Sequence, residues 1–224
     1  MSRAEVNAEF IEYLLAQNVL QFGSFTLNSG RVSPYFFNLG EVSDGAGFAQ
    51  LGNAYADAIL ASGLVFDVLF GPAYKGIPIA VATAVALAQR GTDVGVAYNR
   101  KEAKDHGEGG SLVGATVSGR VLLIDDVITS GKAIRSAVQL IDATDAEIVG
   151  AIVAMDRQET LGEPGSSPGE TSTAVAALSE ELRAPVISIA NLSDLIAYLG
   201  QSAESSAKST LTSMRDYQIR YCQV

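Results

Sequence analysis

Residues 121–133, Val-Leu-Leu-Ile-Asp-Asp-Val-Ile-Thr-Ser-Gly-Lys-Ala, decide the fold class of this 224-residue chain. Four apolar residues predict a buried strand, and the Thr-Ser-Gly turn predicts the start of a helix. In open α/β sheets, ligands bind beyond the carboxyl ends of the strands, where the first amides of the next helix suit a phosphate. The adjacent Asp125 and Asp126 would repel a phosphate, so we expect ribose hydroxyls or a hydrated cation as their partners. The alternative is a helix cap followed by two solvated aspartates.

Short apolar segments alternate with helical patterns on both sides of this stretch. Strands are predicted at 65–70, 94–98, 120–124, 147–155 and 185–190, and helices at 3–17, 47–62, 77–90, 130–143, 193–201 and 204–217. This alternation predicts an α/β protein with a parallel sheet covered by helices on both faces. A turn at Ser29-Gly30 predicts two additional short strands. The polar segments 99–119 and 158–172 interrupt the alternation, and the second is expected to be a surface loop.

The composition argues against several classes of protein and site. Fifteen Lys and Arg against 25 Asp and Glu give a formal charge of −10, which argues against a nucleic-acid surface. A hydrophobic fraction of 48% suffices for one large core, so a single domain over 1–224 is expected. With only Cys222 and His106, neither an intramolecular disulfide nor a Cys/His zinc site is expected. The apolar run at 77–88 is too short for a bilayer and no targeting segment is evident, so we expect a cytoplasmic protein without a membrane partner.

Two further segments could bind an anion. Gly-Pro-Ala-Tyr-Lys-Gly at 71–76 follows a predicted strand, and its small residues would let backbone amides approach an anion beside Lys75. An ordinary turn with a solvated lysine is the alternative. Residues 100–110 combine four potential cations with glycines, which suits either a mobile lid over an anionic leaving group or a solvated loop. The four potential cations are Arg100, Lys101, Lys104 and His106.

Two other segments carry side chains that could contact a ligand. Arg157 follows the strand at 147–155 and could pair with a carboxylate through two hydrogen bonds, or form a surface salt bridge instead. Phe36 and Phe37 offer aromatic surface, with core packing as the alternative.

Residues 121–133 resemble the 5-phosphoribosyl-1-diphosphate (PRPP) motif of type I phosphoribosyltransferases, and other segments are similar to orotate phosphoribosyltransferases. The similar segments are Phe25–Arg31, Ser33–Asn38, Phe70–Pro78, Asn99–Gly110 and Met155–Glu159. The resemblance implies the type I phosphoribosyltransferase fold, with a central mostly parallel sheet flanked by helices and a small N-terminal hood subdomain. The helix and hood would occupy about 1–45, and the core with the C-terminal helices about 46–224. It also implies a homodimer in which loop 100–110 closes over the neighbouring active site.

The implied reaction converts orotate and PRPP into orotidine 5′-monophosphate and diphosphate, a Mg²⁺-dependent glycosyltransferase step in de novo UMP (pyrimidine) biosynthesis. The implied catalytic residues are Lys104, His106, Asp125 and Asp126, with Mg²⁺ carried mainly by PRPP and reached by the two aspartates through water. The implied PRPP and diphosphate ligands are Tyr74, Lys75, Arg100, Lys101, Lys104, His106, Asp125, Asp126, Val127, Ile128, Thr129, Ser130, Gly131, Lys132 and Ala133. Orotate would contact Phe36, Phe37, Thr129 and Arg157.

The chain departs from the family pattern in two segments. Asn28 stands where the family commonly has a substrate-facing lysine, and Ser130 and Lys132 replace an alanine and a threonine of the phosphate loop. Two other functions are weighed against orotate transfer: a purine-type phosphoribosyltransferase and a non-catalytic PRPP-sensing relative. The His106 loop and residues 35–38 oppose the first, and the retained Lys104, His106 and Asp125-Asp126 oppose the second.

Overall fold

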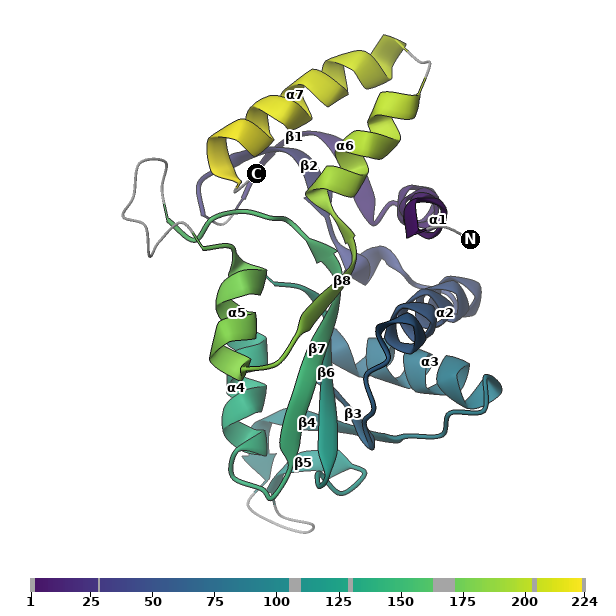
Figure 1. The fold of residues 1–224 in the computed structure, drawn as a ribbon, viewed down its shortest axis with the longest axis vertical. Helices are drawn as coiled ribbons and strands as arrows, with labels where there is room; N and C mark the ends of the chain where they lie inside the picture. The colour runs from purple at the N-terminus through teal and green to yellow at the C-terminus, as the bar shows by residue number, and fades with distance from the viewer. Residues whose placement is uncertain are drawn as a thin grey trace.

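The computed structural model of the protein describes residues 3–27, 29–104, 110–128, 131–162, 172–202 and 205–222. Its centre is a six-stranded sheet in the order β5-β4-β3-β6-β7-β8 (Figure 1). The strands are β3 (Val68–Gly71), β4 (Gly95–Lys104), β5 (Gly110–Gly114), β6 (Arg120–Val127), β7 (Glu147–Asp156) and β8 (Val186–Asn191). All neighbours pair in parallel except β4 and β5, which are antiparallel. The predicted α/β class with a mostly parallel sheet is therefore confirmed.

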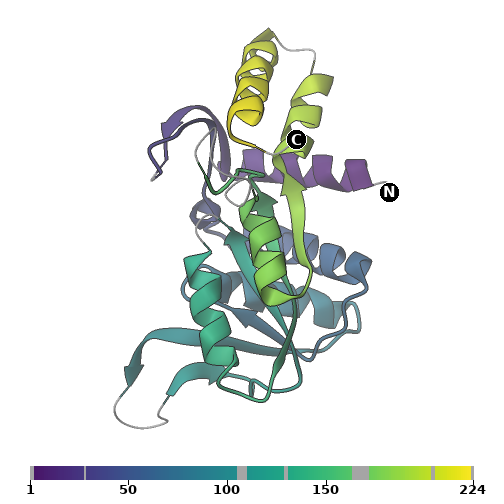
Figure 2. The same ribbon diagram turned by 60° about the vertical axis from the view of Figure 1, so that its left-hand side comes forward.

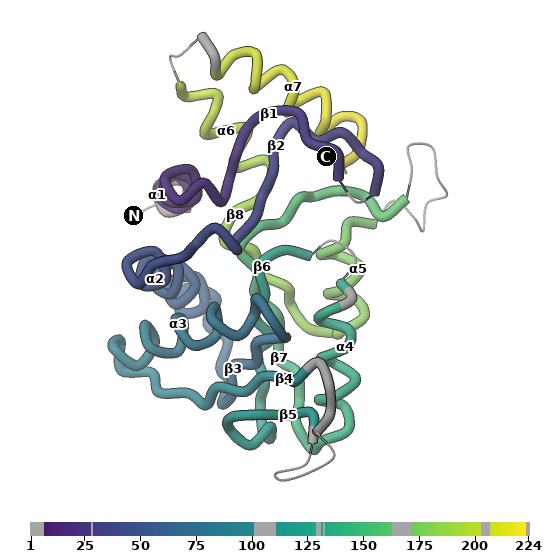
Figure 3. The backbone as a smooth tube through the Cα atoms, turned by 180° about the vertical axis from the view of Figure 1, so that it is seen from behind, coloured from purple at the N-terminus to yellow at the C-terminus, as the bar shows by residue number. Residues whose placement is uncertain are grey.

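Helices cover both faces of the sheet. One face carries α2 (Gly45–Ser62) and α3 (Gly76–Gln89), and the other carries α4 (Lys132–Ile141) and α5 (Ala174–Leu182) (Figures 1 and 3). The central strand β6 shows the consequence: Leu122 and Ile124 belong to one buried cluster, whereas Val121 and Leu123 belong to the other. Because side chains alternate across a strand, a strand covered on both faces has consecutive apolar residues, as β6 does from Val121 to Ile124.

Local sequence explains where the first covering helix begins and ends. Asp44 caps α2, its Oδ1 accepting a hydrogen bond from Gly47 N at 2.7 Å, and Gly63 ends the helix in the left-handed conformation at φ 70°. α2 and α3 approach closely at Gly52, where a Cβ atom would collide with the carbonyl oxygen of Ala82. The absence of a side chain at this position therefore sets the distance between the two helices.

The N-terminal hood and the two C-terminal helices lie at the same end of the molecule (Figure 1). Helix α1 (Arg3–Ala16) leads into an antiparallel hairpin of β1 (Leu20–Thr26) and β2 (Val32–Phe37), followed by the short 3₁₀ helix η1 (Leu39–Glu41). Of the two C-terminal helices, α7 (Ser205–Tyr221) packs against β2, and α6 (Leu192–Gln201) packs against α1 and α7 (Figures 1 and 2). Since Asn191 both ends β8 and caps α6, the carboxyl ends of the parallel strands face the hood.

Two elements differ from the sequence-based expectations. β4 continues to Lys104 and pairs with β5, although a strand was predicted only for 94–98. This pair forms the edge of the sheet, where one face need not be apolar. The helix α5 was not predicted, although Thr173 caps it by accepting from Ala176 N at 3.1 Å. Residues 163–171 of the expected surface loop lie outside the described residues.

Within the described part of the chain, no helix is long and apolar enough to cross a membrane.

Candidate active site

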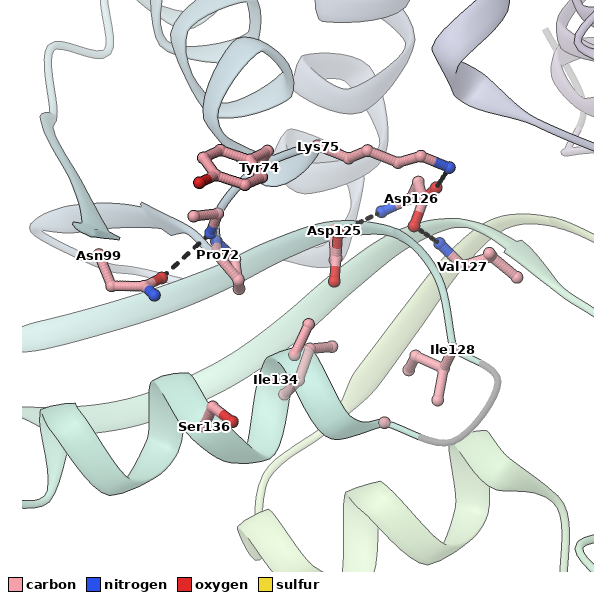
Figure 4. Close-up of a pocket in the computed structure, with 13 residues that line it drawn as sticks. Pro72, Tyr74, Lys75, Asn99, Asp125, Asp126, Val127, Ile128, Ile134 and Ser136 are labelled. Atoms are coloured by element: carbon pink, nitrogen blue, oxygen red, sulfur yellow. Dashed lines mark hydrogen bonds and ion pairs between the residues drawn. The ribbon is translucent and has the colours of Figure 1, made fainter. Parts of the chain in front are cut away.

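Two adjoining cavities lie at the carboxyl ends of the central strands, and the hood lines the second of them. The first has a volume of about 660 Å³ and is bounded by the turn after β3, the end of β6 and the start of α4 (Figure 4). The second, of about 710 Å³, lies between the β1–β2 hairpin and the segment after β7. Lys75, Val127 and Ile128 line both cavities, so a ligand in one can contact a ligand in the other.

Asp125 and Asp126 lie at the end of β6 in the wall of the first cavity. Each is 7% exposed, which excludes the alternative of two solvated aspartates. Asp125 Oδ1 accepts from Asp126 N at 2.9 Å, Asp126 Oδ1 accepts from Val127 N at 2.7 Å, and the Tyr55 hydroxyl donates to the Asp125 carbonyl at 2.8 Å. These bonds fix the two carboxylates at the cavity wall. Burial, followed by repulsion from Asp126, raises the pKa of Asp125 to about 7.

Lys75 extends from the turn after β3 to the carboxylate pair (Figure 4). Its Nζ lies 2.8 Å from Asp126 Oδ2 and 3.2 Å from Asn38 Oδ1. Asn99 Oδ1 holds the same turn by accepting from Ala73 N at 3.0 Å. Tyr74 also lines the first cavity, with 65% of its surface exposed. Lys75 is therefore paired with a buried carboxylate, while half of its side chain stays exposed to solvent.

The loop between β6 and α4 supplies the opposite wall of the first cavity. Val127, Ile128, Gly131 and Ala133 line it. Gly131 precedes α4 in the left-handed conformation, at φ 64°, which glycine adopts at little cost. The first turn of α4 therefore faces the cavity, as required for an anion site at a helix N-terminus.

The second cavity combines aromatic and cationic side chains. Phe36 and Phe37 both line it, but they point to opposite sides of β2: Phe37 is 8% exposed and belongs to the core, whereas Phe36 is 38% exposed. Phe36 stacks on Phe25 with 5.4 Å between ring centroids. Core packing thus describes Phe37, and Phe36 is the phenylalanine with an accessible face.

Arg157 follows β7 and is only 6% exposed, so a surface salt bridge does not describe it. Its Nε donates to Glu159 Oε1 at 2.6 Å, its Nη2 donates to Ser33 Oγ at 3.1 Å, and its Cζ lies 4.2 Å from the centroid of the Tyr35 ring. Asp156 lines the same cavity, and burial raises the pKa of its carboxyl. The buried guanidinium is thereby fixed in the wall of a cavity that is large enough for a flat ring.

The structure brings only part of the predicted site together. Of the described residues, Arg100 lines neither cavity. Asn28, His106, Thr129 and Ser130, and the side chains of Lys101, Lys104 and Lys132, lie outside what the structure describes. The roles assigned to these residues stay predictions.

Several residues of the site were missed. Asn38 and Asn99 stand within segments that resemble the family, but no sequence pattern indicated that they hold Lys75 and its turn. Tyr55 and Tyr217 reach the site from positions distant in the sequence, so local motifs could not reveal them. Glu159 lies two residues from Arg157, but no pattern indicated that it binds the guanidinium.

The described residues contain no group of three or more His, Cys, Asp or Glu side chains that could hold a metal ion. Asp125 and Asp126 offer two adjacent carboxylates, but Asp126 is paired with Lys75. This donor set fits a cation held chiefly by a bound ligand and water, and it does not form a closed protein site.

Comparisons with known proteins identify the family. A model of the phosphoribosyl transferase domain matches residues 38–176. Orotate phosphoribosyltransferase from Stutzerimonas stutzeri is 50% identical over 214 residues, which cover 95% of this chain and 96% of its own. The enzyme from Vibrio cholerae is 51% identical over 214 residues, with the same coverage of both chains. The crystal structure of orotate phosphoribosyltransferase from Francisella tularensis, 35% identical, superposes with a TM-score of 0.83 and covers 96% of this chain and 100% of its own. The chain belongs to the orotate phosphoribosyltransferase family.

Proposed function

We propose that this protein transfers the phosphoribosyl group of PRPP to orotate, yielding orotidine 5′-monophosphate and diphosphate for pyrimidine biosynthesis. The observation that carries the proposal is the position of Lys75. It is bound to the buried carboxylate of Asp126 at 2.8 Å and lines both cavities, one suited to a sugar phosphate and the other to a flat anion.

PRPP fits the first cavity. The ribose hydroxyls would donate to the carboxyl oxygens of Asp125 and Asp126, which are fixed at the end of β6. The 5′-phosphate would accept from amides at the start of α4, near Gly131 and Ala133. The diphosphate would then reach the turn that carries Tyr74 and Lys75.

Orotate fits the second cavity. Its carboxylate would pair with the buried guanidinium of Arg157, because a charge-assisted bond in a dry site is strong. The exposed face of Phe36 would contact the ring. A neutral purine offers no carboxylate to Arg157, which is why the cavity favours orotate over purine bases.

The chemistry requires positioning and charge stabilisation. The acidic ring nitrogen of orotate gives up its proton to water and forms a bond to the anomeric carbon. The bond from that carbon to the diphosphate oxygen breaks, and its electron pair leaves with diphosphate. Lys75 would stabilise the charge on the leaving group at the junction of the cavities. Mg²⁺, bound mainly to PRPP, would supply additional neutralisation of the diphosphate.

The remaining elements of the proposal come from the sequence. Arg100, Lys101, Lys104 and His106 would close over the diphosphate of the neighbouring subunit in a homodimer, with Lys104 having the largest single effect on catalysis. Closure would exclude water from the activated sugar. We also propose that the enzyme is Mg²⁺-dependent and cytoplasmic.

The test follows the loss of orotate absorbance with PRPP and Mg²⁺, alongside adenine, hypoxanthine and uracil as acceptors. Of the four bases, we expect turnover of orotate only. A chelator should abolish this turnover, and added Mg²⁺ should restore it. Turnover of a purine base without orotate turnover, or of no base at all, would refute the proposed reaction. Size-exclusion chromatography with light scattering tests the dimer independently.

A further inference from the structure

The end of the last helix is bound to the segment that presents Arg157. The backbone N–H and the hydroxyl of Thr160 both donate to the Tyr221 carbonyl, at 2.8 Å and 3.1 Å. Cys222 Sγ lies 3.7 Å from the Arg157 carbonyl oxygen, and Glu159 and Cys222 form an antiparallel bridge. The C-terminal end of α7 therefore forms part of the structure behind the second cavity.

Glu159 connects this helix to the guanidinium. Its Oε1 accepts from Arg157 Nε at 2.6 Å and from the Tyr217 hydroxyl at 2.7 Å. Burial, followed by the nearby Glu159 charge, raises the pKa of Tyr217 to about 12, so its hydroxyl is protonated and donates at neutral pH. One carboxylate oxygen thus receives hydrogen bonds from both the arginine and the helix.

A second buried arginine competes for the same carboxylate. Arg31 is 9% exposed, and its Nη1 lies 3.7 Å from Glu159 Oε2, beyond hydrogen-bond distance. Arg31 Nη1 and Nη2 instead donate to the carbonyls of Thr160 and Gly162, at 3.1 Å and 2.7 Å. Without the Tyr217 hydroxyl, the carboxylate of Glu159 would be able to rotate toward Arg31, and the bond that orients Arg157 would weaken.

We propose that Tyr217 is a positioning residue for the base site: its hydroxyl holds the Glu159 carboxylate, which in turn holds the Arg157 guanidinium in the orientation that binds the anionic base. This inference rests on the proposed function, because it assigns Arg157 to the carboxylate of orotate. Tyr217 itself contacts no substrate. Its effect should therefore fall on orotate binding and leave PRPP binding in the first cavity unchanged.

Tyr217→Phe removes the hydroxyl and retains the ring that packs edge-on against Tyr35. The KM for orotate should rise about tenfold, the loss expected for one hydrogen bond to a charged group, with the KM for PRPP and kcat changed by less than about twofold. Tyr221→Phe is the matched control, one helical turn away. It keeps the backbone carbonyl bound by Thr160 and the ring beneath Arg31, and none of the hydrogen bonds among the described residues uses its hydroxyl. The KM for orotate, the KM for PRPP and kcat should all stay at the wild-type values in this variant.

A double-mutant cycle with Arg157→Lys separates positioning from general destabilisation. If Tyr217 acts through Arg157, Tyr217→Phe should add less than about twofold to the orotate KM of the lysine variant. The inference is wrong if Tyr217→Phe leaves the orotate KM unchanged, raises the KM of both substrates equally, or adds its full effect in the Arg157→Lys background. Wild-type protein that turns over no orotate would instead refute the proposed function, and this inference with it.

Discussion

Lys75 and Asp126 form an ion pair, 2.8 Å from Nζ to Oδ2, that joins the turn after β3 to the end of β6. The carboxylate of Asp126 is 10% exposed and the lysine side chain is 50% exposed. The pair is thus a buried acceptor with a cation that solvent can reach. A bound diphosphate would offer the lysine a stronger partner without uncovering the aspartate.

Replacing Lys75 by Met should lower kcat/KM for PRPP about a hundredfold, because one donor to the leaving group is lost. The free energy of unfolding should fall by about 1–3 kcal/mol, because the buried carboxylate of Asp126 loses its cation. Arg120→Met is the control, because Arg120 pairs with Asp67 at 2.9 Å at the other end of β6. Steady-state kinetics and urea unfolding check both expectations. An equal loss of activity in the two variants would contradict the role of Lys75.

Asp125 should make the protein less stable as the pH rises. Its pKa is raised from 3.8 to about 7, so between these values the folded state holds a proton that the unfolded state releases. Stability is therefore full below about pH 4 and falls until about pH 7. Asp125→Asn should unfold with a free energy a few kcal/mol higher than wild type at about pH 8 and similar to it at about pH 4.

Asp67 should affect the pH dependence of stability in the opposite direction. The hydrogen bonds from Arg120 lower its pKa to about 2, so its contribution to stability is present at neutral pH and is lost as the pH falls from about 4 toward 2. Urea unfolding of Asp67→Asn should show a deficit at neutral pH that shrinks on acidification. For Asp125→Asn, a difference in unfolding free energy from wild type that does not depend on pH would show that folding does not raise the pKa of Asp125.

Two glycine-to-alanine changes should have opposite effects. Gly52→Ala places a methyl group against the carbonyl oxygen of Ala82 and should destabilise the protein by about 1–3 kcal/mol as α2 and α3 move apart. Gly200→Ala, near the end of α6 with nothing within 4 Å, should stabilise it by up to about 1 kcal/mol. Thermal and urea unfolding measure both. A neutral Gly52→Ala would show that the helices do not depend on this close approach.

Asn28→Lys restores the cation that the family commonly has at this position. The added charge should lower the KM for PRPP, because the ligand carries a highly negative diphosphate. Asn28→Gln controls for side-chain length without adding charge. An unchanged or raised PRPP KM in the lysine variant would show that Asn28 is not a lost contact.

The local pattern of the sequence was enough for the β6–α4 unit, because an apolar strand, two carboxylates and a glycine turn are consecutive in the chain. It was not enough for β5 or α5. β5 is defined by its pairing with β4, and α5 follows a long polar segment that hid its capping threonine. The surroundings of Arg157 could not be predicted, because Ser33 and Tyr217 lie 124 and 58 residues away from the residues they bind.

The contact between the hood and α7 also bears on how the protein folds during synthesis. Tyr35 in the N-terminal hairpin packs against Tyr217 in the last helix, with 6.3 Å between ring centroids. A nascent chain can complete the sheet once β8 has left the ribosome, but the wall behind the second cavity still lacks α7. A chain without α7 would lose the Tyr217 and Tyr221 contacts behind the second cavity, and we expect it to keep the lining of the first cavity, to which α7 contributes no residue.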